Sequence, residues 1–297
     1  MKYHKSVLLN EGINALNVAK GRKYIDATLG GGGHTEELLN HGGIVLGIDQ
    51  DDEALSFVKS RLDDKNLTLA KGNFRNINTI AREHGFEKVW GILFDLGISS
   101  HQIDTAERGF SYILPGPLDM RMDKSLTVAA SDLVNALGKS ELIELFRNFG
   151  EETNANRVAD LIIKRRKIAP FKTTDDLTLT LATAYGFRTV NDFARATSGK
   201  RVFQALRIAV NDELGSLKEA LPKALDLLEE NGRMAIITFH SLEDRIVKRA
   251  FLDFEDKKLG IVKTDKPILP TQEEVKENGR SKSAKLRIFE RSTSSAK

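Results

Sequence analysis

Short apolar runs alternate with amphipathic stretches along the first 95 residues of the chain. Four runs are continuous enough to predict strands buried on both faces: residues 23–25, 43–49, 67–70 and 89–95. Apolar side chains at helical spacing predict helices in three of the intervening stretches: residues 35–39, 53–62 and 77–84. Residues 7–16 are typical of a short strand or turn that runs into a helix. This alternation predicts a parallel sheet with right-handed crossovers.

The alternation stops after residue 95 and resumes near residue 205. Residues 96–123 are rich in Gly, Ser and Pro and predict a long ordered loop, of the kind that is often functional. Helical patterns without any strand signal follow at residues 141–149, 156–166 and 174–185. We therefore predict an α/β domain in two parts, residues 1–115 and 205–297, with an inserted helical domain at 116–204.

The second α/β part has its own pattern of helices and strands. An apolar stripe predicts a helix over 203–221, and Pro222 is expected to start or kink the next helix, which runs to residue 230. Ser241 begins a variant capping box ahead of a helix that runs to residue 254. Strands are predicted at residues 233–238, 261–263 and 286–290, and a loop at 266–285.

Three acids, Asp26, Asp49 and Asp95, fall where predicted strands end. Ligands bind at that edge of open α/β sheets, although any one of these acids alone would be explained by a turn or a helix cap. Between the first strand and its helix lie Gly30 to Gly33. Glycines there let the backbone approach a ligand closely, which indicates a nucleotide-like cofactor or, alternatively, a structural turn.

The spacing of the glycines favours a methyl donor over a dinucleotide. When a Gly-x-Gly-x-x-Gly motif is aligned from Gly30, its third glycine position is occupied by Thr35. When it is aligned from Gly31, that position is occupied by Glu36. S-adenosylmethionine carries no phosphate, and it needs a close-approach loop and an acid for the ribose hydroxyls. Asp26 and Asp49 fit that requirement better.

Composition narrows the chemistry further. The 297 residues include 45 Lys and Arg against 42 Asp and Glu, a balance that permits a polyanionic partner without requiring one. The absence of cysteine excludes disulfides, thiolate metal sites and a cysteine nucleophile, and we predict no metal site. No signal-type segment or apolar run of about 18 residues is present, which predicts a soluble cytoplasmic protein without membrane contact.

Ten blocks, in order along the chain, resemble the bacterial ribosomal RNA small subunit methyltransferase H family, which methylates cytosine N4. They are residues 4–9, 26–34, 47–49, 72–74, 95–102, 108–112, 116–123, 203–208, 239–245 and 280–287. The resemblance implies a Rossmann-like class I S-adenosylmethionine-dependent methyltransferase sheet whose inserted helical domain recognises the substrate. It also implies methylation of a 16S cytidine in the decoding region, on assembled or late-assembling small subunits. It leaves a homodimer open. One segment departs from the family pattern: residues 197–200, Thr-Ser-Gly-Lys, stand where a His-Pro-Ala-Thr type segment is usual.

The resemblance assigns the donor site to seven residues: Gly32, Gly33, His34, Asp49, Phe74, Asp95 and Gln102. Asp95 is also the expected catalytic residue, because it can accept the N–H groups of the cytosine amine. The absence of cysteine agrees with N4 rather than C5 as the methylated atom, since C5 methylation ordinarily needs a cysteine adduct. A core aromatic at Phe74 and a loop-stabilising amide at Gln102 stay open as alternatives.

Five further residues are candidates for substrate binding: Phe110, Tyr112, His240, Arg280 and Lys282. The two aromatics are expected to stack on a base that has left its helix, or else to anchor their loop. His240 is equally explained as a structural histidine. The basic cluster at 280–287 favours contact with the phosphates of small-subunit ribosomal RNA, whereas that at 164–167 is typical of a solvated helix face.

Overall fold

The structure, a computed structural model, describes residues 6–292 of the chain. His4 and Lys5, the first two residues of the first family block, lie outside this range, as do residues 293–297 of the Ser-rich end. Within residues 6–292 a single seven-stranded sheet has the order β3-β2-β1-β4-β5-β7-β6. Its strands are β1 (Lys23–Asp26), β2 (Ile44–Asp49), β3 (Leu67–Lys71), β4 (Val89–Asp95), β5 (Leu228–Thr238), β6 (Gly260–Val262) and β7 (Lys285–Arg291).

Strands β1 to β5 are parallel, and β7 runs antiparallel to both β5 and β6. The predicted α/β sheet is confirmed, including the strands near residues 261 and 286. Because β1 pairs with both β2 and β4, the strand order reverses at β1, and the loop that follows β1 lies where open sheets bind ligands.

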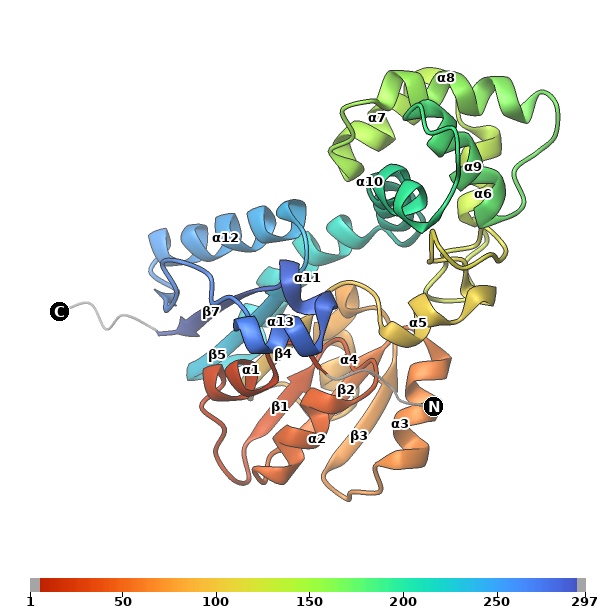
Figure 1. Cartoon of the computed structure of the whole chain (residues 1–297). Helices are drawn as coiled ribbons and strands as arrows, with labels where there is room; N and C mark the ends of the chain where they lie inside the picture. Colours follow the sequence, from red (N-terminus) through yellow and green to blue (C-terminus); the bar gives the residue numbers. More distant parts are fainter. Residues whose placement is uncertain (1–5, 293–297) are drawn as a thin grey trace. The chain divides into compact units, whose positions relative to one another are not determined.

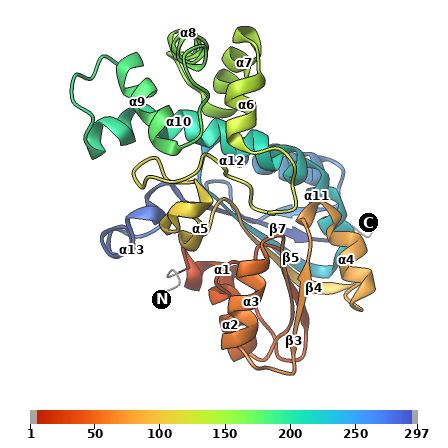
Figure 2. The ribbon, with the colours of Figure 1, turned by 90° about the vertical axis from the view of Figure 1, so that its right-hand side faces the viewer.

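Helices cover both faces of this sheet (Figures 1 and 2). Successive strand residues point to opposite faces: Ile25 joins a core with residues of α4, α11 and α12, whereas Tyr24 joins a second core with residues of α1 and α2. Burial on both faces explains why the strands are continuous apolar runs rather than alternating ones. Figure 2 shows α4 and α11 across the sheet from α1 and α2.

The helices in chain order are α1 (Leu9–Ala15), α2 (Gly33–Asn40), α3 (Asp52–Arg61), η1 (Phe74–Asn76), α4 (Ile77–Glu83), α5 (Ser100–Asp104), η2 (Ala106–Arg108), α6 (Ala130–Ala136), α7 (Lys139–Gly150), α8 (Ala155–Arg166), α9 (Thr174–Ala184), α10 (Asp192–Asn211), α11 (Glu213–Leu227), α12 (Ser241–Asp256), α13 (Gln272–Glu277) and η3 (Gly279–Ser283). None of the helices within residues 6–292 is both long and apolar enough to cross a bilayer.

Several predicted boundaries were wrong. The helix expected to run to residue 230 ends at Leu227, and β5 begins at Leu228 rather than at residue 233. The helix expected over 203–221 is interrupted at Asp212, which adopts a left-handed conformation (φ 45°) between α10 and α11, so the apolar stripe runs across two helices. Pro222 lies inside α11 rather than at the start of a helix. The loop expected at 266–285 contains α13 and η3, which are too short to give a clear periodic signal.

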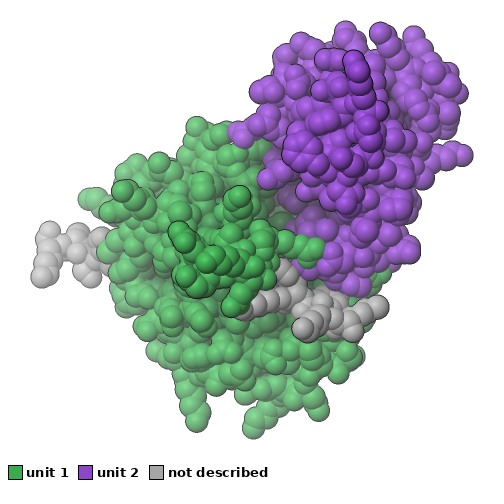
Figure 3. Space-filling model, in the orientation of Figure 1, with its two compact units in different colours: residues 1–97, 214–297 green, residues 98–213 purple. Residues whose placement is uncertain are grey.

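The chain divides into two compact units, shown in Figure 3. The first comprises Met1–Gly97 and Leu214–Lys297 and holds the sheet; the second is Ile98–Glu213. The second unit is wider than the predicted insertion of 116–204 because loop residues before position 116 share its core. Phe110, for example, is buried together with Phe146 and Leu177 of α7 and α9.

Candidate active site

The loop after β1 depends on glycine for its shape. Gly30 (φ 50°) and Gly32 (φ 75°) both adopt left-handed backbone conformations, which side chains disfavour. Gly32 also caps the N-terminus of α2, and a β-carbon there would lie 2.8 Å from Cγ2 of Val58 in α3. The same substitution at Gly33 would collide with the hydroxyl of Ser6. The turn and the close packing therefore both require glycine at these positions.

Two of the strand-end acids hold this loop in place. Asp26 is buried, and its carboxylate accepts a hydrogen bond from the Thr35 hydroxyl (2.7 Å) and one from the Thr28 amide (3.2 Å). Asp49, across the loop, accepts bonds from the amides of Gly30 (2.8 Å) and Asp51 (2.9 Å). Burial raises the pKa of each of these two carboxyls to about 6, although the hydrogen bonds act in the opposite direction.

Asp95 at the end of β4 faces His34 in the first turn of α2. The two side chains approach to 3.6 Å, between Nδ1 of His34 and Oδ2 of Asp95. Burial lowers the pKa of His34 to about 4, so the imidazole is neutral at pH 7. Burial, followed by the nearby carboxylates of Asp26 and Glu243, raises the pKa of Asp95 well above its usual value. The pair is therefore a neutral imidazole beside a carboxyl group whose pKa is raised, rather than an ion pair.

Two polar atoms of this pair lack hydrogen-bond partners among the described residues. They are Oδ1 of Asp95 and Nε2 of His34, and both are buried. Buried polar groups are normally satisfied, so each unpaired atom indicates a ligand group or a water. With the glycine turn and Asp49 beside them, these atoms fit a donor that offers ribose hydroxyls and a charged amino-acid end. The donor binding predicted for Gly32, Gly33, His34 and Asp49 is compatible with this geometry.

Phe74, the first residue of η1, is partly buried and packs edge-on against Phe94 of β4, with ring centroids 5.7 Å apart. It thus contributes to the core beneath the sheet edge while keeping part of its ring exposed. This position is consistent with both alternatives, a core aromatic and a contact for the adenine.

Gln102 belongs to the second unit, where it closes a capping box at α5. Its side-chain oxygen accepts a bond from the Ser99 backbone amide (3.0 Å), and the backbone amide of Gln102 donates to the Ser99 hydroxyl (3.2 Å). The loop-stabilising amide considered as an alternative is therefore present. A contact of Gln102 with the donor stays a prediction.

The two predicted stacking aromatics also belong to the second unit. Phe110 is only 5% exposed in its core, with the Arg108 guanidinium 5.8 Å from its ring. Tyr112 packs edge-on against Phe203 (centroids 5.9 Å apart). Both aromatics anchor their loop, and base stacking by either one stays a prediction.

The departing segment 197–200 lies within α10 and packs against this loop. A β-carbon at Gly199 would lie 2.9 Å from that of Tyr112, and the Ser198 hydroxyl donates to the Ala194 carbonyl (2.7 Å). Ser198 and Gly199 are therefore buried in the second unit, whereas Thr197 and Lys200 are exposed.

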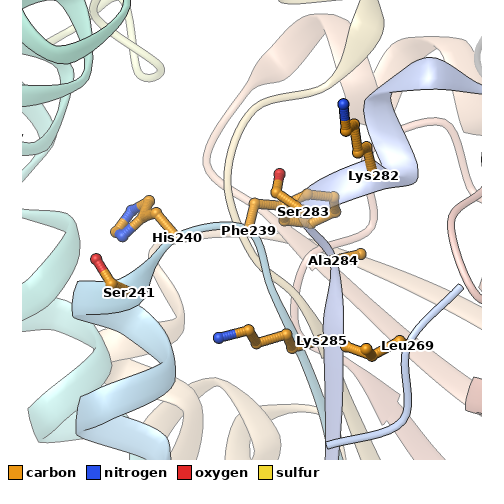
Figure 4. Close-up of a pocket in the computed structure, with 8 residues that line it drawn as sticks. All are labelled: Phe239, His240, Ser241, Leu269, Lys282, Ser283, Ala284 and Lys285. Atoms are coloured by element: carbon orange, nitrogen blue, oxygen red, sulfur yellow. The ribbon is translucent and has the colours of Figure 1, made fainter.

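The remaining predicted substrate residues lie in the first unit. His240 caps α12 by accepting a bond from the Glu243 amide (3.4 Å), while Glu243 accepts bonds from the amides of Phe239 and His240. The capping histidine precedes Ser241, one residue earlier than the predicted cap. Arg280 and Lys282 lie in η3, and Lys282 lines a hollow together with His240 (Figure 4).

Sequence reasoning missed the two threonines that organise the acids. Thr35 donates to Asp26, and the Thr28 hydroxyl accepts a bond from the Asp95 amide at 2.6 Å. Thr28 thereby links the loop after β1 to the end of β4. For Thr28 the available signal was a hydroxyl residue two positions after a strand-end acid, a common arrangement in ordinary turns, whereas Thr35 is nine residues from Asp26 and gave no such signal.

Comparison with known proteins shows which family the chain belongs to. The family model described as the MraW methylase family matches residues 1–292. The ribosomal RNA small subunit methyltransferase H of Halothermothrix orenii is 45% identical and covers 98% of this chain and 99% of its own length. The protein of the same name from Brevibacillus brevis is 42% identical, with coverages of 97% and 98%. A putative rRNA-methylase structure from Clostridium thermocellum has a TM-score of 0.46 at 15% identity, with 97% of both chains covered, a similarity too low to carry an argument. Because the family model and these relatives span nearly the whole chain, the protein belongs to the MraW methylase family of ribosomal RNA small subunit methyltransferase H proteins.

Proposed function

We propose that this enzyme transfers a methyl group from S-adenosylmethionine to N4 of a cytidine in 16S ribosomal RNA. The proposed substrate is the decoding region of assembled or late-assembling small subunits in the cytoplasm. The family membership and the names of its relatives support a ribosomal RNA substrate. The choice of N4 and of the decoding region rests on the sequence resemblance and on the chemistry of the site.

The observation that carries this proposal is the carboxyl of Asp95 at the end of β4, with one buried oxygen unpaired. Cytosine N4 is a weak nucleophile because its lone pair is delocalised into the ring. A hydrogen-bond acceptor at its N–H groups makes electron density available, and a carboxylate with a raised pKa is a stronger acceptor and a better base. The bound donor supplies an electrophilic methyl group on a positively charged sulfur.

The other residues of the site orient the reactants. Asp49 would hold the ribose hydroxyls in charge-assisted bonds, and the glycines would admit the donor close to the backbone. Because His34 is neutral, it does not cancel the charge of an ionised Asp95. A charged imidazolium in its place would weaken Asp95 as a proton acceptor. We propose that Asp95 accepts the proton that leaves N4 as the new N–C bond forms.

The absence of cysteine supports N4 over C5 as the methylated position. Attack at C5 ordinarily begins with a thiolate adduct on the pyrimidine ring, and this chain has no cysteine to form one. An exocyclic amine needs no such adduct, because placement about 3–3.5 Å from the methyl group and removal of a proton suffice.

The deciding experiment incubates the enzyme with isotopically labelled donor and small subunits from cells that lack it. Nucleoside mass spectrometry of the RNA should reveal labelled N4-methylcytidine. Label only at C5, or only on protein, would contradict the proposal. An Asp95→Asn variant is the matched control, because it keeps the side-chain shape and removes the proposed proton acceptor.

A further inference from the structure

An open hollow of about 330 Å³ lies beside the end of β5 in the first unit (Figure 4). Its lining comes from the start of α12, from η3, from the start of β7 and from Leu269. The residues are Phe239, His240, Ser241, Leu269, Lys282, Ser283, Ala284 and Lys285. This volume falls at the lower end of the range for small-molecule sites.

The hollow is close to the proposed reaction centre. Asp95 pairs with Ile237 across β4 and β5, and the amide of Leu96 donates to the Ile237 carbonyl at 3.0 Å. Phe239 follows Ile237 by two residues, and its ring would lie 3.6 Å from a β-carbon built at Gly97. Phe239, which lines the hollow, therefore lies close to the end of β4, where Asp95 is located.

The lining divides into an apolar part and a cationic part. Phe239 is partly buried, Leu269 is 59% exposed, and with Ala284 they form an apolar wall. Lys282 and Lys285 supply positive charge, and Ser283 adds a hydroxyl (Figure 4). An aromatic face beside cations is the combination with which proteins bind single-stranded nucleic acid, because bases stack and phosphates are neutralised.

The uncompensated charge of the hollow is that of Lys282. Lys285 lies 3.2 Å from Asp244, whose carboxylate also pairs with Arg287 (2.6 Å), and these cations hold the pKa of Asp244 below its usual value. The amides of Phe239 and His240 are already bonded to the Glu243 carboxylate, so these two amides are occupied. Lys282 is exposed and has no acidic partner within residues 6–292.

We infer that this hollow binds a nucleotide that neighbours the target cytidine in the unpaired ribosomal RNA strand. Its base packs on Phe239 and Leu269, and its phosphate contacts the ammonium of Lys282. This inference rests on the proposed function, since it takes ribosomal RNA as the substrate. It adds a second nucleotide subsite, through which the enzyme holds the strand beside the base that it methylates.

The test compares Lys282→Gln and Lys282→Arg with wild type in steady-state methylation of small subunits over a series of salt concentrations. Lys257→Gln is the matched control, because Lys257 is an exposed lysine just beyond the opposite end of the 16-residue α12. Loss of one phosphate contact should lower the slope of log KM against log salt by about 1 and raise KM at low salt. We expect Lys282→Arg to restore both values, and kcat and donor affinity to stay unchanged in all three variants.

A second variant, Phe239→Leu, tests the base. Loss of one stacked base should raise KM about 5- to 150-fold without changing the salt slope. Thermal unfolding of this variant verifies that the fold is intact. Calorimetry with inorganic phosphate tests whether the hollow binds a free anion instead of RNA. A phosphate affinity that depends on Lys282, together with an unchanged KM for subunits, would overturn the inference.

Wild-type KM and salt slope in Lys282→Gln would also overturn it. Failure of the proposed function is distinguishable, because it would appear in the wild-type enzyme as the absence of labelled N4-methylcytidine. If only the inference about the subsite is wrong, labelled N4-methylcytidine would still be formed.

Discussion

Replacement of Gly32 by alanine tests whether the donor loop depends on its glycine turn. The left-handed backbone at Gly32 (φ 75°) costs an L-residue about 1–2 kcal/mol. The added methyl would also lie 2.8 Å from Cγ2 of Val58, well inside the ordinary contact distance of about 3.5–4.0 Å. Overpacking of this kind adds about 1–3 kcal/mol. We therefore expect Gly32→Ala to lower the free energy of unfolding by about 2–5 kcal/mol.

Gly21→Ala is the matched control for this variant. Gly21 has nearly the same backbone conformation (φ 78°), but a β-carbon there meets nothing within 4 Å. It precedes β1, at the opposite end of the strand from the donor loop. Gly21→Ala should therefore lose only the backbone part, about 1–2 kcal/mol, and bind the donor normally.

Denaturant unfolding and calorimetric titration with S-adenosylmethionine measure the two effects separately. We expect Gly32→Ala to bind the donor at least about tenfold more weakly, because relief of the contact with Val58 has to move the loop or α3, and a tenfold loss corresponds to about 1.4 kcal/mol. Equal destabilisation of the two variants together with equal donor affinity would refute the assignment of this loop to the donor site.

Three further predictions concern the acids. Asp49→Ala should weaken donor binding by about 1–3 kcal/mol in calorimetry, through loss of a charged acceptor, and an unchanged affinity would remove Asp49 from the site. Asp95→Asn should reduce the single-turnover rate at saturating donor by about 10²- to 10⁴-fold, whereas a wild-type rate would exclude a proton acceptor there. Burial raises the pKa of Asp26 from 3.8 to about 6, so Asp26 binds its proton more tightly in the folded protein than in the unfolded chain. The wild-type protein therefore loses stability as pH rises from about 4 to 6. Relative to Asp26→Asn, that loss should reach about 3 kcal/mol at pH 7 in denaturant titrations, and a pH-independent difference would contradict the burial argument.

The hydrophobic pattern alone predicted the sheet and placed the three acids at its edge. The strands containing Ile25, Ile48 and Phe94 are buried on both faces, so each is a continuous apolar run that is recognisable without its neighbours. The acids that end these runs meet at one edge because parallel strands share a direction. The glycine turn is equally local, since left-handed conformations at Gly30 and Gly32 depend on the chain around them.

Only the tertiary structure decided the roles of side chains with more than one possible partner. Phe110 could stack on a base or fill a core, and the packing of distant helices against its loop buries it. His240 caps a helix because Glu243 is in reach, and Asp212 ends α10 through a single left-handed residue that leaves the apolar stripe unbroken. The raised pKa of Asp95 and the lowered pKa of His34 arise from burial, and for Asp95 also from the carboxylates of Asp26 and Glu243, which separate elements bring near it. Sequence spacing carries no measure of burial or of the distance between remote residues. The sequence pattern therefore located the site at the edge of the sheet, whereas only the fold decided the chemistry of the residues there.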